Sequence, residues 1–568
     1  MAITRRTLLK GSALAVAAML LPISTRSLAA VVSQDAAPPD GQYELNDWIW
    51  IDSDGRIVIG VSQCEVGQGI YTGLAEVVAA EMDADWAQVT VKFVTGRDAY
   101  RQVAGGEAFA QFVAASTSMT KFYQRTRLAG AQARDFFLRA GARHLALSPR
   151  QCRTEKGWVI EEGGQRKVAY GDLVRYAAEL PLDPQPALKS EAQEQESFIG
   201  KPLLRVDTPE KVDGSAIYGI DIDLPEMLIG VPWMVPDLSG KLVAVRNERQ
   251  IRAMPGVVDL VLTRQWSMNN MVGLDHDMSL NTVIVVAASY WQAKKAADLL
   301  EVDWLPGAGQ ALSGSAIAAE NLAMLDGDTL VSAVERGEAP ALIRGAEQDS
   351  RLHEARYGAP YVAHATLEPC NATSHFSHKA KRDEYQYRRY LLQGNPEALR
   401  VLEATAAAAG WQREPPPGVY RGMSCNIWLG RNNAFTTYVG LVVEIAIQEG
   451  RLRVLRAVCA IDCGKVINPN LVRANVEGGI GFALTTCLHS ELHFERGGVV
   501  EGNFDLYPLL AIAEMPKVEV VVLDSARAPQ GCGEVSTAVV APAIASALHK
   551  ATGKTYRTMP FPREFSSV

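Results

Sequence analysis

The pattern of apolar and polar residues predicts a hairpin and two helices at the start of the folded region. Two apolar runs within residues 47–62 flank the turn Asp52-Ser53-Asp54-Gly55, which is typical of a β-hairpin. In residues 72–82, apolar side chains recur every three or four positions, which predicts an amphipathic helix. A longer helix is predicted over residues 121–141. A strand, a short glycine loop and a helix therefore follow one another here.

The last third of the chain predicts two long strands and a helix with one apolar stripe. The strands cover residues 436–447 and 452–461, and the helix begins at Asn468-Pro469. Gly478-Gly479 lies inside that helix, where each glycine costs about 1 kcal/mol relative to alanine. Close approach of another helix or of a ligand is the simplest reason for both glycines. Helices and strands in mixed order predict a multi-domain α+β fold.

Charge and cysteine content narrow the classes of function. The 568 residues carry a formal net charge of −8 without runs of Lys or Arg, which argues against nucleic acid as a partner. The eight cysteines are scattered without any Cys-x-x-Cys pair, so the chain does not hold an iron–sulfur cluster by itself. Cys459 and Cys463 would share one face of a strand, which favours core packing over metal binding.

Residues 1–30 have the pattern of an export signal. Arg5-Arg6 precedes a short apolar run, and small residues follow near Ala30. The paired arginines resemble a twin-arginine signal, which exports proteins that are already folded. We therefore expect a periplasmic protein, with an ordinary secretory signal as the alternative. The apolar run is shorter than a transmembrane helix requires.

A candidate catalytic acid lies on a glycine-flanked loop near the C-terminus. Gly531-Cys532-Gly533-Glu534 precedes an apolar helix that runs to about residue 549. Glycines permit close approach of backbone to a ligand, and a carboxylate held there could act as a general base. The structural alternative is that this loop only caps the start of the helix and that the carboxylate of Glu534 is exposed to solvent.

Two polar segments nearer the N-terminus are candidate ligand-binding loops. Gly67-Gln68-Gly69 joins a strand to a helix, where backbone amides and the helix dipole favour an anion. Ser116-Thr117-Ser118 precedes the long helix and could bind a phosphate or a heterocycle. A structural turn is the alternative for the first segment, and helix capping is the alternative for the second.

The number and order of these motifs resemble one enzyme family, and the resemblance covers most of the mature chain. The chain is similar to the molybdopterin-binding large subunits of the xanthine dehydrogenase/aldehyde oxidase family, in particular to the isoquinoline 1-oxidoreductase β-subunit type. The matching segments are residues 65–69, 116–118 with 127–131, 205–219, 364–371, 462–479 and 531–534.

This resemblance implies a molybdenum hydroxylase subunit. It implies a molybdopterin cofactor, in the cytosine dinucleotide form, whose molybdenum has no protein ligand. Glu534 would be the base, with water as the oxygen source, and electrons would pass to a small [2Fe–2S] subunit and then to a cytochrome c. The substrate would be an aldehyde or an N-heteroaromatic compound. The implied cofactor-binding residues are Gly67, Gln68, Gly69, Ser116, Thr117, Ser118, Asn475, Gly531 and Gly533.

The resemblance also divides the chain into segments. Besides the signal peptide, the expected segments are an N-terminal molybdopterin-binding segment (42–180), a linker (181–203), a hammerhead-like α/β domain (204–305), a shortened molybdopterin-binding segment (306–380) and a C-terminal molybdopterin-binding domain (381–568).

The chain departs from the family pattern in its middle. Between about His375 and Asp383 the family inserts a further part of the cofactor domain, with a Gly-Gly-Gly-Phe-Gly loop that occurs nowhere in this sequence. Ala114-Ala115 replaces glycines, and Asn475 stands where glutamine is usual. The alternative function is therefore a shortened, inactive relative that acts as a binding or assembly subunit. A cofactor-free hydrolase using Glu534 is a weaker third hypothesis.

Overall fold

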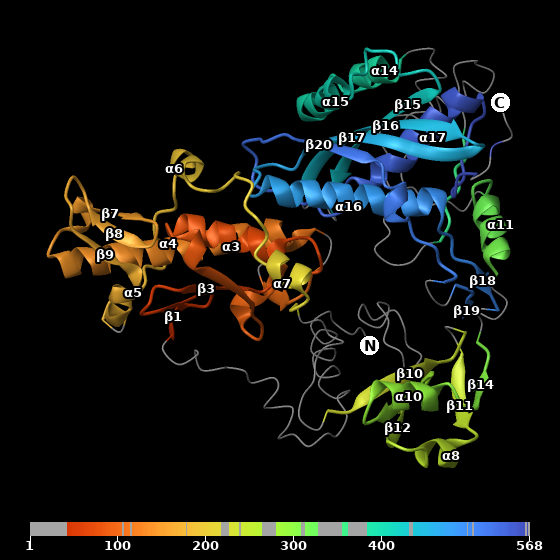
Figure 1. Cartoon of the computed structure of the whole chain (residues 1–568), viewed down its shortest axis with the longest axis horizontal. Helices are drawn as coiled ribbons and strands as arrows, with labels where there is room; N and C mark the ends of the chain where they lie inside the picture. Colours follow the sequence, from red (N-terminus) through yellow and green to blue (C-terminus); the bar gives the residue numbers. More distant parts are fainter. Residues whose placement is uncertain are drawn as a thin grey trace, which may run out of the picture.

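The computed structural model describes residues 42–562 and 565, except for 105–106, 114–115, 178, 217–226, 238–239, 264–279, 308–312, 328–354, 362–382, 431–434, 497 and 502–504. Figure 1 shows an N-terminal unit, a C-terminal unit beside it, and a small unit of strands and helices that lies apart from both. The expected signal peptide, the segment 364–371 and most of the bridge before Asp383 lie outside the described residues.

The N-terminal unit is built on a four-stranded sheet with strand order β1-β2-β3-β4. The predicted hairpin is confirmed as the antiparallel pair β2–β3, and β3 pairs in parallel with β4. Helix α3 connects β3 to β4 and packs against the long helix α4. The bounds are β1 Gln42–Asn46, β2 Ile49–Asp52, β3 Ile57–Val61, α3 Ile70–Glu81, β4 Val89–Phe93, β5 Gln102–Ala104, β6 Glu107–Ala110 and α4 Thr117–Leu145.

A small antiparallel sheet, β7-β8-β9, completes the unit and packs on α4. Gly141 lies at this contact, since a Cβ there would be 2.5 Å from the Cβ of Val159. The remaining bounds are β7 Cys152–Glu155, β8 Trp158–Glu161, β9 Lys167–Ala169 and α5 Tyr170–Leu173.

The segment expected to be a linker is bound closely to both large units. Arg127 from α4 pairs with Glu194, and Lys465 of the C-terminal unit pairs with the same carboxylate. Gly200 donates its N–H to the carbonyl of Ile467. The segment contains α6 Glu191–Glu196 and is followed by α7 Thr208–Asp213. It therefore ties the two units together instead of separating them.

The small unit has its own apolar core between a three-stranded sheet, β10-β13-β12, and helix α10. A two-stranded sheet, β11-β14, completes it. The bounds are β10 Ile229–Met234, β11 Lys241–Val245, α8 Glu248–Arg252, β12 Val257–Thr263, β13 Thr282–Ala287, α10 Tyr290–Ala297 and β14 Val302–Leu305, followed by α11 Gly314–Met324.

The C-terminal unit is a sheet covered by helices on both faces. Its strand order is β15-β16-β17-β20, and the predicted strands correspond to β16 and β17. Helices α14 and α15 cover one face, while α16 and α17 pack on the other (Figure 1). The bounds are α14 Glu384–Leu391, α15 Pro396–Ala409, β15 Val419–Leu429, β16 Thr436–Gln448, β17 Arg451–Asp462, α16 Pro469–Leu488, β18 Phe494–Glu495, β19 Gly498–Val499, β20 Lys517–Val522 and α17 Val540–Thr552.

Helix α16 confirms the predicted start and apolar stripe. The Asn468 side chain accepts a hydrogen bond from the N–H of Asn470, which caps the helix, and Pro469 occupies its first position. Val472, Val476, Ile480 and Leu484 are buried. The mixture of sheets and helices confirms the predicted α+β fold. Among the described helices, none combines the length and apolar character needed to span a bilayer.

Candidate functional site

A cavity of about 590 Å³ lies where the N-terminal and C-terminal units meet. Five segments contribute most of its wall: the loop 66–70 before α3, the start of α4, residues 463–468 after β17, the first half of α16, and residues 529–534 before α17. Most of these segments are far apart in sequence. All the candidate site residues except Thr117 contribute to its wall.

The loop that carries Glu534 packs tightly against the start of α4. A Cβ at Gly531 would lie 2.6 Å from the Cβ of Ser116, so no side chain fits between these two segments. Thr437 in β16 donates its hydroxyl to the carbonyl of Gly531 at 2.7 Å. Glu534 follows three residues after Gly531 and lines the cavity. The carboxylate therefore stands on a loop that is fixed to both units.

The glycine loop before α3 does not offer the anion cradle that the sequence predicts. The carboxylate of Glu65 already accepts the N–H groups of Gly67 at 2.8 Å, Gly69 at 2.9 Å and Tyr71 at 3.2 Å. Arg205 neutralises the same carboxylate at 3.2 Å. The expectation that these amides bind an external anion is therefore wrong, because an internal carboxylate occupies them.

The Gln68 side chain likewise forms hydrogen bonds within the loop. Its Oε1 accepts the N–H of Val66 at 2.7 Å, and its Nε2 donates to the carbonyl of Cys64 at 2.9 Å. Asn475 in α16 donates its amide to the carbonyl of Gln68 at 3.1 Å. The pair joins the glycine loop to α16, so both residues shape the cavity wall.

The three adjacent hydroxyls have different roles. Ser116 adopts a left-handed conformation with φ of 54° and makes no capping bond, although it occupies the N-cap of α4. Thr117 accepts a hydrogen bond from Gln102, and Ser118 donates one to Gln63 at 2.9 Å. Of the three, Ser116 is the hydroxyl that remains at the junction with the Glu534 loop.

The double glycine in α16 has two separate explanations. A Cβ at Gly479 would collide with the hydroxyl oxygen of Ser536, so this glycine permits close packing before α17. A Cβ at Gly478 would have no neighbour within 4 Å among the described residues, and Gly478 lines the cavity. Gly479 therefore permits close packing in the protein interior, and Gly478 leaves space in the cavity.

Sequence reasoning missed a thiol pair beside Glu534. Cys463, expected to be a core residue, lines the cavity together with Cys532. A hydrogen bond from Cys463 lowers the pKa of the Cys532 thiol, while the same contact and burial raise the pKa of Cys463. The spacing of 69 residues between them gives no sequence signal.

The loop after β17 is anchored by a buried carboxylate. Asp462 accepts hydrogen bonds from the Gly464 N–H at 3.0 Å, from Arg527 at 2.6 Å, and from Arg400. Burial alone would raise the pKa of Asp462, but these three donors outweigh it and hold the pKa below its usual value. The next residue, Cys463, accepts the N–H of Gln530, which positions the loop before Glu534.

A second buried carboxylate joins α3 to α16. Glu76 has no exposed surface, and its Oε1 accepts the Asn468 amide at 2.6 Å. Its Oε2 has no hydrogen-bond partner within the described part of the chain. Burial raises the pKa of Glu76 to about 8, although the bond from Asn468 opposes the shift. Glu76 is therefore protonated at neutral pH.

The raised pKa of Glu76 predicts that the stability falls as the pH rises from 4.5 to about 8. The folded pKa of about 8 exceeds the ordinary value of 4.5, so the protonated form is favoured by folding. Its contribution is fully present below pH 4.5 and is lost as the pH rises to about 8, at about 1.4 kcal/mol per pH unit. We expect Glu76→Gln to melt at a higher temperature than the natural protein at pH 9, with little difference at pH 5. Equal pH slopes in calorimetric melts of the two proteins would contradict this.

A family model described as "Molybdopterin cofactor-binding domain" matches residues 12–208 and 380–516, which together are more than half of the chain. The chain belongs to this family.

Individual relatives match different shares of the chain. The membrane-bound aldehyde dehydrogenase [pyrroloquinoline-quinone] of Gluconacetobacter polyoxogenes is 32% identical over 48% of this chain and 33% of its own length. The isoquinoline 1-oxidoreductase subunit beta of Brevundimonas diminuta is 22% identical over 93% of each chain. The aldehyde oxidoreductase structure from Desulfovibrio gigas aligns with a TM-score of 0.46 at 10% identity, over 64% of this chain and 80% of that one.

The alignment with the Brevundimonas protein tests the expectation that the middle of this chain is shorter than in its relatives. It extends over 733 positions, although the present chain has only 568 residues. That relative therefore contains residues for which this chain has no counterpart.

The cavity fits a molybdopterin in size and in the character of its wall. Its volume lies in the range of about 300–1,000 Å³ that small-molecule sites occupy. Gly478 leaves open space, and Ser116 and Asn475 supply neutral polar groups at the wall. Within the described ranges, no group of three His, Cys, Asp or Glu side chains could hold a metal ion.

Proposed function

We propose that this chain is the molybdopterin-binding subunit of an exported oxidoreductase that hydroxylates an aldehyde or an N-heteroaromatic compound with water as the oxygen source. The observation that carries the proposal is the presence of Glu534 in the same cavity as Ser116, Asn475 and Gly478. Names of relatives that specify an aldehyde and isoquinoline support these two substrate classes.

The chain's own residues would bind the cofactor and move a proton. When bound, molybdopterin would supply a metal centre for the oxidation. Ser116, Asn475 and the backbone of residues 531–533 would contact the cofactor, and Gly478 would leave room for it. Glu534 would accept a proton through its carboxylate and so act as a general base. We propose the cytosine dinucleotide form, as the resemblance implies.

We further propose that the protein is folded with its cofactor and then exported to the periplasm by the twin-arginine route. Arg5-Arg6 and the apolar run after it support this destination. Because the scattered cysteines do not provide the spacing of an iron–sulfur site, a [2Fe–2S] subunit would take the electrons. A cytochrome c would be the next acceptor.

A second candidate function is an inactive, shortened relative that acts as a binding or assembly subunit. The observation that favours it is the set of residues in the Brevundimonas relative without a counterpart here. Loss of part of the cofactor domain would remove one wall of the site.

The test is molybdenum and pterin content per chain, measured after coexpression with a genomically adjacent small subunit. We expect about one molybdenum per chain and activity on aldehydes or N-heterocycles. We expect Gly478→Leu, which places a side chain in the open space, to lower molybdenum at least about tenfold without lowering the melting temperature. Glu477→Leu changes an exposed neighbour on the same helix and is the control.

Absence of molybdenum from folded protein would overturn the oxidoreductase proposal and support the inactive relative. Bound pyrroloquinoline quinone is assayed in the same samples, because one relative is named for that cofactor. Equal molybdenum in the natural protein and in Gly478→Leu would show that the metal is held elsewhere.

A further inference from the structure

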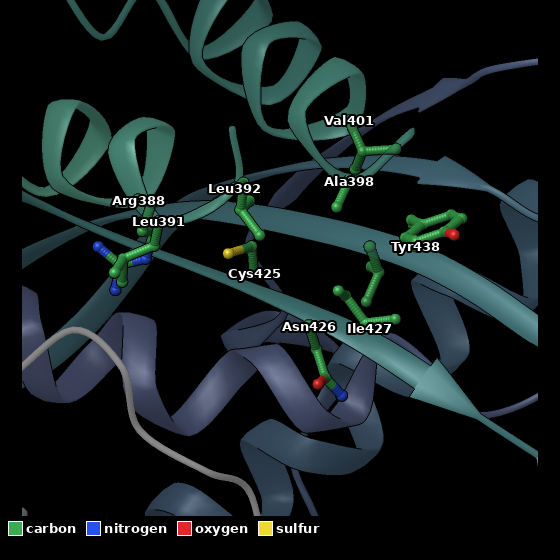
Figure 2. Close-up of a pocket in the computed structure, with 10 residues that line it drawn as sticks. Arg388, Leu391, Leu392, Ala398, Val401, Cys425, Asn426, Ile427 and Tyr438 are labelled. Carbon is green, nitrogen blue, oxygen red and sulfur yellow. The ribbon is translucent and has the colours of Figure 1, made fainter. Parts of the chain in front are cut away.

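A second, smaller cavity lies on the opposite face of the C-terminal sheet from α16. Its volume is about 270 Å³, and residues of α14, α15, β15 and β16 and of the loop between the two helices line it. Figure 2 shows Arg388 at one end, Tyr438 at the other, and the side chains of Leu392 and Cys425 between them. Ala398 and Val401 cover it from α15 (Figure 2). The wall between the two ends is therefore mainly apolar, and Asn426 also contributes to the lining.

The guanidinium of Arg388 is buried without a full set of partners. Arg388 is 1% exposed, and its Nη1 donates to the carbonyl of Glu384 at 3.2 Å. Among the residues that the structure describes, its Nε and Nη2 have no hydrogen-bond partner. A buried cation with two unused donors is strongly disfavoured unless an anion accompanies it.

The acidic groups near Arg388 are engaged elsewhere or uncharged. Glu384, one turn before it, accepts the N–H of Met423 at 2.8 Å, binds Lys550 at 3.0 Å, and accepts the hydroxyl of Ser546. Burial raises the pKa of the Cys425 thiol, and the charge of Arg388 and a hydrogen bond from Arg388 only partly offset this, so the thiol stays neutral. Among the described residues, Arg388 therefore has no carboxylate partner.

The shape of the unused donors indicates which anion would bind. The Nε–H and one Nη2–H of an arginine lie parallel on the same edge of the guanidinium, and this edge matches the two oxygens of a carboxylate. The rest of the cavity offers apolar surface from Leu392, Val401 and Ala398. A cavity of about 150 Å³ accepts benzene, so about 270 Å³ accommodates a ring with a carboxylate.

We propose that this cavity is a binding site for a small apolar monocarboxylate of about the size of benzoate, held through its two oxygens by Arg388. The site is separate from the one that contains Glu534, because the two cavities share no lining residue and lie on opposite faces of the sheet. The proposal does not depend on the function proposed for the larger cavity.

The experiment is titration calorimetry of the full chain with benzoate, benzamide and acetate. Benzoate is expected to bind at least about tenfold more tightly than benzamide, which lacks the charge, and than acetate, which lacks the ring. Arg388→Met should abolish benzoate binding while retaining the apolar volume of the side chain. Arg389→Met is the matched control, because Arg389 is the next residue on α14 and pairs with Glu403 at the surface.

A second readout separates binding from a purely structural role. Without ligand, Arg388→Met should melt at the same or a higher temperature than the natural protein, since it removes an uncompensated buried charge. A lower melting temperature, or benzoate affinity that Arg388→Met leaves unchanged, would overturn the proposal. As an independent requirement, Ala398→Leu, which fills the cavity from α15, must also weaken benzoate binding for the proposal to stand.

Discussion

Replacing Glu534 by glutamine is expected to lower turnover at least about 100-fold while molybdenum content stays at the natural level. The amide has the size and much of the hydrogen-bonding capacity of the carboxylate, so the cavity wall is preserved. It does not accept a proton at neutral pH, so the function of a general base is lost. The measurement is steady-state turnover of the purified complex, expressed per molybdenum.

The control for this variant is Glu477→Gln. Glu477 is an exposed residue of α16 and is not part of the cavity wall. It undergoes the same chemical change within the same unit, and we expect its turnover to match the natural protein. If Glu534→Gln also retained full turnover, Glu534 would not be the base.

Replacing Asp462 by alanine is expected to lower the free energy of unfolding by about 3–5 kcal/mol. The carboxylate has no exposed surface and binds two guanidinium groups, those of Arg400 and Arg527. Its removal leaves both cations without this counterion and frees the loop that holds Gln530. Because that loop leads to Glu534, cofactor content should fall as well. Urea unfolding followed by tryptophan fluorescence measures the first effect, and elemental analysis measures the second.

Glu403→Ala provides the comparison for Asp462→Ala. Glu403 pairs with Arg389 in the same unit, but both side chains are about half exposed. Solvent screens such pairs, so we expect a change below about 1 kcal/mol. Equal stabilities of the two variants would show that the buried network at Asp462 contributes no more than a surface ion pair.

The sequence by itself determined the local elements and singled out candidate residues that the structure places in one cavity. The β2–β3 hairpin and α16 are recognisable because apolar periodicity, turn residues and a capping asparagine are all local signals. Gly531 and Gly478 could be singled out because glycine is costly in regular structure and marks close approach or open space. The order of such motifs also sufficed to indicate the family.

Contacts between distant residues were decided by the tertiary structure. Glu65 lies in the same loop as Gly67 and Gly69. Its carboxylate turns back and accepts the N–H groups of these two residues, and it is held there by an ion pair with Arg205, which is far along the chain. The raised pKa of Glu76 comes from complete burial against α16, which no local pattern reports. Arg388 is one of many arginines in the sequence, and only the packing of α14 on the sheet leaves its donors unused. Burial and long-range pairing set the charge state and availability of these groups, and both quantities exist only once the chain has folded.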